Sequence, residues 1–379
     1  MIKNSFLLIF AVVSMFACVS NNQSAKTAMQ PEAYLDALSK KFRFNGNVLM
    51  AENGKIVFQK SYGFANFETK RLLNDSSVFE LASLSKQFTA TAILLLMNRN
   101  KLKLSDSLMQ YFPELSYRGI TIYHLLTHTS GLPDYEEAMK TKWDKSKIAF
   151  NSDMIAFLAK EKMPLLFAPG TKWEYSNTAY VILASIVEKV SGQSFKDFMT
   201  QHIFQPLQMN HTQIYNTRRS LKDTIPNYAY GYEYNDSLKK YFIPDSVAEL
   251  KFVIYLDGIQ GDGVVNSTTG DLLKWDRSVK NHTLLSEATQ NEMLKEQVLA
   301  DTLSKSHYGF GVFLEKTDLG NIISHSGGWP GYCTYLLRNV EKDQTIIVLS
   351  NNDSDSEAVA LALHQLLNKK PVVGTYEYN

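Results

Sequence analysis

Cysteine is scarce in this sequence, since its 379 residues contain only Cys18 and Cys333. A protein with two cysteines has at most one disulfide, so its fold depends on packing and not on covalent cross-links. A charge excess of either sign is missing too, because 39 lysines and arginines stand against 38 aspartates and glutamates. Without a basic stretch the chain lacks an electrostatic footprint for nucleic acid. We therefore expect a globular protein, 45% hydrophobic, that binds neutral and compact substrates.

Several signatures of catalysis and cofactor binding are also absent. The chain contains no Gly-x-Ser-x-Gly, no Gly-x-x-x-x-Gly-Lys, no His-Glu-x-x-His and no Cys-x-x-Cys. These absences exclude the nucleophile elbow, the phosphate-binding loop and the common zinc motifs. We expect neither a metal nor an organic cofactor.

The N-terminal segment predicts export. Lys3 precedes an apolar stretch from Phe6 to Ala17, which is too short to span a bilayer. Residues 1–17 are therefore interpreted as a signal peptide. Ala17 followed by Cys18 resembles a bacterial lipoprotein signal, in which Cys18 would carry the lipid and form the only membrane contact, at the cell envelope. An ordinary cleaved signal is the alternative. Residues 18–30 are polar and are predicted to be a tether.

The remaining chain alternates between strand-like and helix-like patterns. Residues 31–42 have helical spacing, and two apolar runs around Asn53 and Gly54 predict a hairpin over 46–66. Strands are predicted again near the end, followed by a helix over 356–370; the strands are 307–316, 321–328, 332–340 and 345–352.

These patterns predict an α/β (α+β) fold. One antiparallel sheet would be assembled from both chain ends, at about 31–80 and 301–370, and flanked by the terminal helices. A large and mostly helical insert would occupy about 81–300, with the functional cleft between the two parts. The domain is placed at 31–370, and the tail at 371–379 has no readable role.

Ser83 and Lys86 stand one helical turn apart at the start of the apolar segment "ELASLSKQFTATAILLL". Residues three apart share a helix face, so the Lys86 amine is expected beside the Ser83 hydroxyl. The following helix is apolar almost all round, which predicts that it is buried and that Lys86 is half buried. A buried lysine without a paired acid tends to lose its proton and can then accept one from serine. The alternative is a helix-capping Ser83 beside a solvated Lys86.

The Ser-x-x-Lys pattern is weak by itself, because it recurs at Ser237 to Lys240 within a polar turn. There, Lys240 is most simply a solvated charge. The remaining nucleophile candidate, Cys333 in "GYCTYLLRNV", is interpreted as an inert strand cysteine and not as a catalytic thiol.

Two further motifs support a functional role for the Ser-x-x-Lys pattern at Ser83 and Lys86. Tyr175 to Asn177 is the only Tyr-x-Asn in the chain, and "HSGG" spans His325 to Gly328. With Ser83 and Lys86, their order and spacing resemble the serine penicillin-recognising enzymes, especially class C β-lactamases and DD-peptidases. The flanking stretches "LLTHTSGLPDY" and "GDGVVNSTTGDLLKW" are similar to that family too, and the resemblance covers roughly residues 31 to 368.

This resemblance implies a role for each matched residue. Ser83 would be the acylated nucleophile, while Lys86 and Tyr175 would share the proton transfers, the choice of base being open. Asn177 would bind the amide carbonyl of the substrate. The backbone N–H groups of Ser83 and Gly328 would form the oxyanion hole.

One position departs from the family pattern. His325 stands where β-lactamases of this family usually carry the lysine of Lys-Thr-Gly, and with Gly327 it is expected to bind substrate. Some DD-peptidases, D-amino-acid amidases and esterases of the family have His-x-Gly there. A histidine is only partly charged near neutral pH, so it would hold a carboxylate less firmly than lysine. Gly327 and Gly328 fit a substrate lying along the strand, although a simple turn would need them equally. A second His-x-Gly at 307–309 shows that the triplet alone is not specific.

The sequence thus favours a serine hydrolase that cleaves amide or ester bonds of a small peptide, ester or β-lactam through an acyl-serine. DD-peptidase, D-amino-acid amidase or esterase activity is favoured over the alternative of a class C-like β-lactamase. A non-catalytic binding protein or sensor for cell-wall fragments is the alternative of another class. His128 and Asp262, near these motifs, are interpreted as a structural residue and a loop residue near the cleft.

Overall fold

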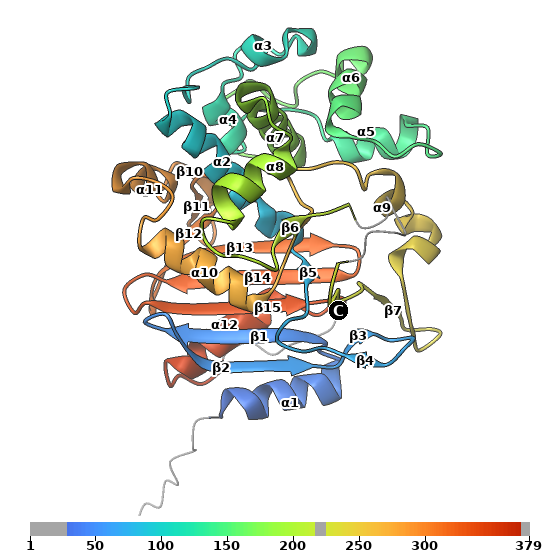
Figure 1. Cartoon of the computed structure of the whole chain (residues 1–379), viewed down its shortest axis with the longest axis vertical. Helices are drawn as coiled ribbons and strands as arrows, with labels where there is room; N and C mark the ends of the chain where they lie inside the picture. The colour runs from blue at the N-terminus through green and yellow to red at the C-terminus, as the bar shows by residue number, and fades with distance from the viewer. Residues whose placement is uncertain (1–28, 217–224, 373–379) are drawn as a thin grey trace, which may run out of the picture.

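An eight-stranded antiparallel sheet forms the centre of the computed structural model, which describes residues 29–216 and 225–372 (Figure 1). The predicted signal peptide and Cys18 lie outside the described residues, as does the tail beyond residue 372. The strand order is β10-β11-β12-β13-β14-β15-β1-β2. The strands are β1 Gly46–Glu52, β2 Lys55–Tyr62, β10 Val298–Asp301, β11 Ser306–Tyr308, β12 Phe313–Thr317, β13 Gly320–Trp329, β14 Tyr332–Asn339 and β15 Gln344–Ser350.

Both ends of the chain meet inside this sheet. Strand β1 pairs with β15, with Val48 opposite Val348, so an N-terminal hairpin extends a C-terminal meander. The hairpin turn has φ values of 50° at Asn53 and 74° at Gly54, and positive φ at both central positions is the requirement of a type I′ turn. The predicted α+β fold with a sheet from both termini is confirmed.

The two faces of the sheet belong to different hydrophobic cores. Val48 and Val348 point to the face covered by the terminal helices, α1 Pro31–Phe42 and α12 Ser356–Leu367. Their neighbours Leu49 and Leu349 point to the opposite face and join the larger core, which includes residues of α10 Thr269–Lys280. Alternation of this kind over adjacent strands fixes the register, because a shift by one residue would exchange the two faces.

The helical part lies at one edge of the sheet, above β13 in Figure 1. Its central helices, α2 and α7, pack against each other and are buried along most of their length. The α-helices are α2 Lys86–Asn98, α3 Leu108–Tyr111, α4 Ile122–Leu126, α5 Tyr135–Lys142, α6 Asn151–Glu161, α7 Asn177–Ser191, α8 Phe195–Met199, α9 Phe252–Tyr255 and α11 Glu287–Met293. Shorter helical turns are η1 Ala82–Ser85, η2 Pro113–Leu115, η3 Thr200–Phe204, η4 Pro244–Ser246 and η5 Ala248–Leu250.

Several short strands were not predicted. Strands of two or three residues offer too few positions for a period of two to be recognised. They are β4 Arg71–Leu72, β5 Phe79–Glu80, β6 Gln213–Ile214, β7 Glu233–Asn235, β8 Lys240–Phe242 and β9 Val265–Ser267, whereas β3 Phe64–Asn66 forms the end of the predicted hairpin over 46–66. The edge strand β10 was missed as well.

The single strand expected over 307–316 is wrong, because this stretch forms the end of β11 and the start of β12, antiparallel to each other. The turn between them includes Gly311, at a φ of 77°. None of the helices in the described ranges is long and apolar enough to cross a membrane.

Candidate active site

Ser83 and Lys86 lie where the sheet meets the helical part. Ser83 is in the turn η1, and Lys86 begins α2 immediately after it. The Lys86 Nζ is 3.0 Å from Ser83 Oγ, as the spacing predicted. Lys86 is 0% exposed, so the prediction of a half-buried side chain underestimated its burial.

The Lys86 amine is held by two acceptors from distant parts of the chain. Its Nζ is 2.8 Å from Asn177 Oδ1 and 2.8 Å from the main-chain oxygen of Asp262. An ammonium has three protons to donate, and these two oxygens with Ser83 Oγ provide three acceptors. An amine that had lost a proton would keep two of these bonds and could accept the hydroxyl proton of Ser83. The arrangement therefore suits a proton exchange between serine and lysine.

The start of α7 places Tyr175 and Asn177 beside Lys86. Ser176 caps this helix, since its Oγ accepts a hydrogen bond from the Ala179 N–H at 3.2 Å. The centre of the Tyr175 ring is 4.9 Å from Lys86 Nζ. The Tyr175 hydroxyl is buried and has no hydrogen-bond partner among the residues that the structure describes. A buried hydroxyl without a partner is costly for the fold, and such groups are frequent at functional sites.

His128 packs against the Tyr175 ring and the segment that carries it. It is fully buried, and its ring centre lies 4.3 Å from that of Tyr175. Its Nδ1 accepts a hydrogen bond from the Ser176 N–H at 3.0 Å. Burial, and then the nearby charge of Lys86, hold the pKa of His128 well below its usual value, so the ring is neutral. His128 thus fixes the main chain and the aromatic ring of the Tyr-Ser-Asn segment.

His325 lies on β13 but faces the interior. It is 1% exposed, with Nε2 3.1 Å from the Tyr308 hydroxyl and Nδ1 2.6 Å from the Ser326 carbonyl oxygen. Nδ1 is therefore the protonated nitrogen, and Nε2 accepts from Tyr308. Burial, followed by the charge of Lys86, lowers the pKa of His325 to about 3. The expectation of partial charge near neutral pH is thereby corrected, because this histidine is neutral there.

Gly327 and Gly328 belong to β13 and not to a turn, which comes afterwards at Gly331 with a φ of 86°. A Cβ on Gly327 would lie 2.1 Å from the carbonyl oxygen of Leu81, two residues before Ser83. Gly327 is therefore needed for the close packing of β13 against the segment that carries Ser83. A Cβ on Gly328 would meet no described atom within 4 Å, so space is open beside this residue.

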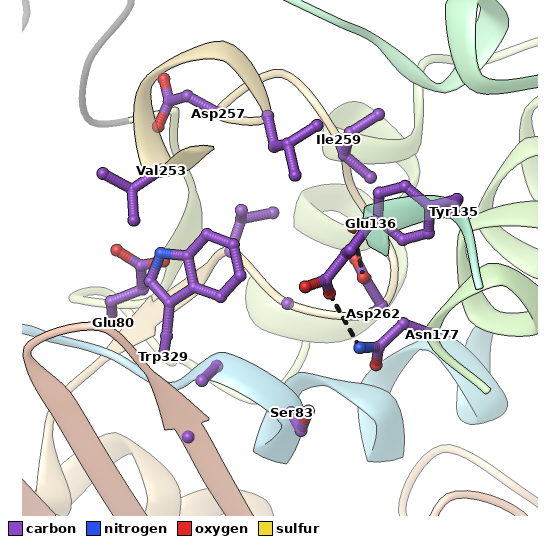
Figure 2. A pocket seen from close by; sticks show the side chains of 15 residues that line it. Glu80, Ser83, Tyr135, Glu136, Asn177, Val253, Asp257, Ile259, Asp262 and Trp329 are labelled. Carbon is purple, nitrogen blue, oxygen red and sulfur yellow. Dashed lines mark hydrogen bonds between the residues drawn. The ribbon is translucent and has the colours of Figure 1, made fainter. Parts of the chain in front are cut away.

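A cavity of about 140 Å³ opens to solvent above Ser83, and we name it the Ser83 cavity (Figure 2). Its lining residues do not include Lys86, Tyr175, His325 or Gly327. The lining comprises Glu80, Ala82, Ser83, Tyr135, Glu136, Asn177, Val253, Leu256, Asp257, Ile259, Asp262, Gly263, Val264, Gly328 and Trp329.

Glu136 is a cavity residue that sequence reasoning missed. Its Oε1 accepts a hydrogen bond from Asn177 Nδ2 at 2.9 Å, the dashed line drawn between them in Figure 2. Burial, and then the carboxylate of Asp262, raise the pKa of Glu136 to about 7. The only signal in the sequence was its place in "LPDYEEA", directly after a stretch similar to the family, and nothing there separates it from the exposed Glu137.

Asp262 contributes mainly through its backbone. Its main-chain oxygen binds Lys86, while its carboxylate accepts a hydrogen bond from the Tyr135 hydroxyl at 2.9 Å. Burial raises the pKa of this carboxyl group. The preceding Gly261 has a φ of 112°, and a Cβ there would lie 2.5 Å from Ala184 Cβ. The loop therefore passes close to α7, which brings the carbonyl group to the lysine.

An antiparallel sheet joined to a helical part, with a buried Ser-x-x-Lys pair at the junction, defines a class: the serine hydrolases of the β-lactamase fold. The described residues contain no group of three or more His, Cys, Asp or Glu side chains that could hold a metal ion. Comparison with known proteins then identifies the family. The family model described as Beta-lactamase matches residues 33–369, and the chain belongs to this family.

Individual relatives agree with this assignment. The chain is 43% identical over 344 residues to "Penicillin-binding protein 4*" of Bacillus subtilis (strain 168), covering 90% of this chain and 76% of that protein. A penicillin binding protein from Bacillus halodurans is similar in structure, with a TM-score of 0.77 and 26% identity over 88% of this chain and 99% of its own. The octameric penicillin-binding protein homologue from Pyrococcus abyssi has a TM-score of 0.78 and 25% identity, covering 90% of this chain and 77% of its own.

Proposed function

We propose that this protein cleaves amide or ester bonds through an acyl-enzyme formed on Ser83. The observation that carries the proposal is the 3.0 Å contact between Ser83 Oγ and the fully buried amine of Lys86, at the edge of an open cavity. Burying the amine of a lysine costs free energy, because the group loses its hydration. A buried lysine hydrogen-bonded to a serine at a cavity is therefore more typical of a functional site than of a purely structural contact.

The proposed reaction has two steps. Ser83 Oγ attacks the carbonyl carbon, and its proton passes to Lys86 or Tyr175 while the carbonyl oxygen becomes negatively charged. The N–H groups of Ser83 and Gly328 stabilise this oxygen, and Asn177 orients the substrate. The C–N or C–O bond then breaks, and the departing amine or alcohol takes up the proton. Water repeats the sequence on the acyl-Ser83 ester, which releases the acid and restores the serine.

We favour DD-peptidase, D-amino-acid amidase or esterase activity over β-lactamase activity. The reason is the triplet from His325 to Gly327, which resembles that of some DD-peptidases, D-amino-acid amidases and esterases and not the Lys-Thr-Gly of β-lactamases. His325 is also buried, neutral and bonded to Tyr308, so it supplies no positive charge for a substrate carboxylate, which favours an amidase or esterase in particular. Export through the N-terminal segment and lipid attachment at Cys18 belong to the same proposal, because they would place the enzyme at the cell envelope. The small peptide or ester substrate would be the only binding partner that this site requires.

Intact-mass measurement after separate incubation with a fluorophosphonate and a penicillin tests the proposal. Ser83→Ala is the critical variant, and Ser237→Ala, in the exposed second copy of the motif, is the matched control. We expect both reagents to label the wild type and Ser237→Ala but not Ser83→Ala. A long-lived penicillin adduct supports the peptidase, amidase or esterase activity, whereas rapid penicillin hydrolysis would identify a β-lactamase. Absence of labelling by either reagent, with a folded protein, would favour a non-catalytic binding protein.

A further inference from the structure

Glu136 occupies a position that the proposed catalytic steps do not use. It is the second residue of α5 and lines the Ser83 cavity, where Figure 2 shows it across from Trp329. It also lines a neighbouring cavity with Glu233 and Asp353. Glu136, Gly328 and Trp329 are shared by both cavities, so the Glu136 carboxylate lies where a substrate extending from Ser83 would pass.

A chain of hydrogen bonds connects Glu136 to the nucleophile. Glu136 Oε1 accepts from Asn177 Nδ2 at 2.9 Å, and Asn177 Oδ1 accepts from Lys86 Nζ, which contacts Ser83 Oγ. Both ends of the Asn177 amide are therefore fixed, which determines which end faces Lys86. The Glu136 carboxylate is thus connected to Lys86 and Ser83 through the single side chain of Asn177.

The carboxylate is only partly neutralised by the residues around it. Lys140, one turn further along α5, pairs with Glu137 at 3.0 Å and lies over the Phe252 ring at 4.3 Å. The other charged groups acting on Glu136 are Lys86, which is bonded elsewhere, and the acids Asp134 and Asp262, which disfavour its charge. A carboxylate in such surroundings gains most from an additional cationic donor, because hydrogen bonds between two charged groups are the strong ones.

We propose that Glu136 is a specificity-determining residue whose carboxylate binds a protonated amine on the acyl part of the substrate. This inference rests on the proposed function, since it concerns the substrate of the same site. An α-amino group is two bonds from the carbonyl carbon that Ser83 attacks, and Ser83, Asn177 and Glu136 line the same cavity, with Asn177 bonded to Glu136. The preferred substrates are then amides or esters of amino acids or peptides with a free amino group. The neutral His325 fits such substrates, because they bring a cation and need no positive counter-charge.

Two matched substrates test this assignment, D-alanine p-nitroanilide and its N-acetyl derivative, which lacks the ammonium group. The variant is Glu136→Gln, which retains an oxygen to accept from Asn177 but removes the charge. Glu137→Gln, its exposed neighbour on α5, is the control. We expect Glu136→Gln to lower kcat/KM for the free amine about 10- to 100-fold and to change that for the N-acetyl compound less than about 3-fold. Glu137→Gln should change neither.

A second readout separates this inference from the proposed function. D-alaninamide should slow fluorophosphonate labelling of Ser83 more than N-acetyl-D-alaninamide does, and Glu136→Gln should remove the difference. Equal losses for both substrates would assign Glu136 to positioning of Asn177 and overturn the inference. The inference would also be overturned if D-alaninamide and N-acetyl-D-alaninamide slowed the labelling of Ser83 to the same extent. If Ser83 is not labelled at all, the proposed function itself fails.

Discussion

The two Ser-x-x-Lys copies in this chain share a sequence pattern, but one is buried and the other is exposed to solvent. Lys86 is 0% exposed and bonded to Ser83, whereas Ser237 and Lys240 are both exposed at the β7–β8 hairpin. The acceptors that hold Lys86, Asn177 Oδ1 and the main-chain oxygen of Asp262, come from sequence positions far away. A catalytic pair is therefore made by its surroundings, because only burial and added acceptors convert a solvated amine into a positioned one.

The two His-x-Gly copies differ in the same way. His325 is buried between strands and bonded to Tyr308, while His307 on β11 is partly exposed. Gly327 packs against the segment that carries Ser83, whereas Gly309 packs against the carbonyl oxygen of Met293. Each pair thus offers a matched substitution, in which the same change is made in two environments.

The largest contrast is expected between Lys86→Met and Lys240→Met. Removing the Lys86 amine should slow fluorophosphonate labelling of Ser83 by roughly 10²- to 10⁴-fold, the range of acid–base contributions. It should also lower the free energy of unfolding by about 1–3 kcal/mol, because two buried acceptors lose their donor. Lys240→Met should leave the labelling rate unchanged and the stability within about 0.5 kcal/mol. Labelling of Lys86→Met at the wild-type rate would contradict a role in proton transfer.

A second contrast involves two neighbouring tyrosines, Tyr175 and Tyr180. The Tyr175 hydroxyl has no partner among the described residues, so Tyr175→Phe should preserve stability while slowing labelling about 10²-fold. The Tyr180 hydroxyl donates to the Leu126 carbonyl oxygen at 2.9 Å, so Tyr180→Phe should cost about 1–3 kcal/mol with little direct effect on labelling. Urea unfolding and labelling kinetics on both variants measure these effects. A destabilised Tyr175→Phe with normal labelling would reverse the assignment.

Adjacent glycines of β13 give a third contrast. The Cβ of Gly327→Ala would lie 2.1 Å from the Leu81 oxygen and 2.3 Å from Thr334 Oγ1, so the variant should lose about 3 kcal/mol of stability. Gly328→Ala adds its methyl group to open space and should unfold at the wild-type urea concentration. Its effect should instead appear in the labelling rate, since it narrows the Ser83 cavity. Equal stability of the two variants would show that β13 can move away from η1.

The smallest contrast concerns pH and compares His325→Gln with His307→Gln. The unfolded chain binds a proton at His325 near pH 6.5, whereas the folded chain does so only near pH 3. Stability is therefore present above pH 6.5 and is lost as the pH falls below it, by about 1–2 kcal/mol at pH 5 from this residue. His128 and His364 act in the same direction, because burial lowers their pKa values as well.

Urea unfolding at pH 7.5 and pH 5 measures this loss. His325→Gln should reduce the difference between the two pH values, and His307→Gln should leave it as it is in the wild type. If His325→Gln left the stability difference between pH 7.5 and pH 5 unchanged, His325 would take up its proton at pH 5 in the folded protein as well, which would contradict the prediction.

Much of the fold could be predicted because its signals are local. The Asn53–Gly54 turn, the helix over 31–42 and the C-terminal strands each carry a complete pattern within a few residues. The junction of β11 and β12 was misjudged, since a glycine turn inside an apolar stretch interrupts a strand without changing its composition. The short strands β5, β6 and β9 were missed because distant partners define them, as Ser267 does for Phe79. The local hairpin of β7 and β8 was missed because its strands are only three residues long.

The sequence by itself determined the family, the sheet made from both chain ends and the residues Ser83, Lys86, Tyr175 and Asn177 as candidates, because spacing and order are written along the chain. Tertiary structure decided what those residues can do. Full burial of Lys86, neutrality of His325, the packing need for Gly327 and the presence of Glu136 beside Asn177 depend on contacts between segments far apart in sequence. Desolvation and hydrogen bonding act through space, so no local pattern can report them.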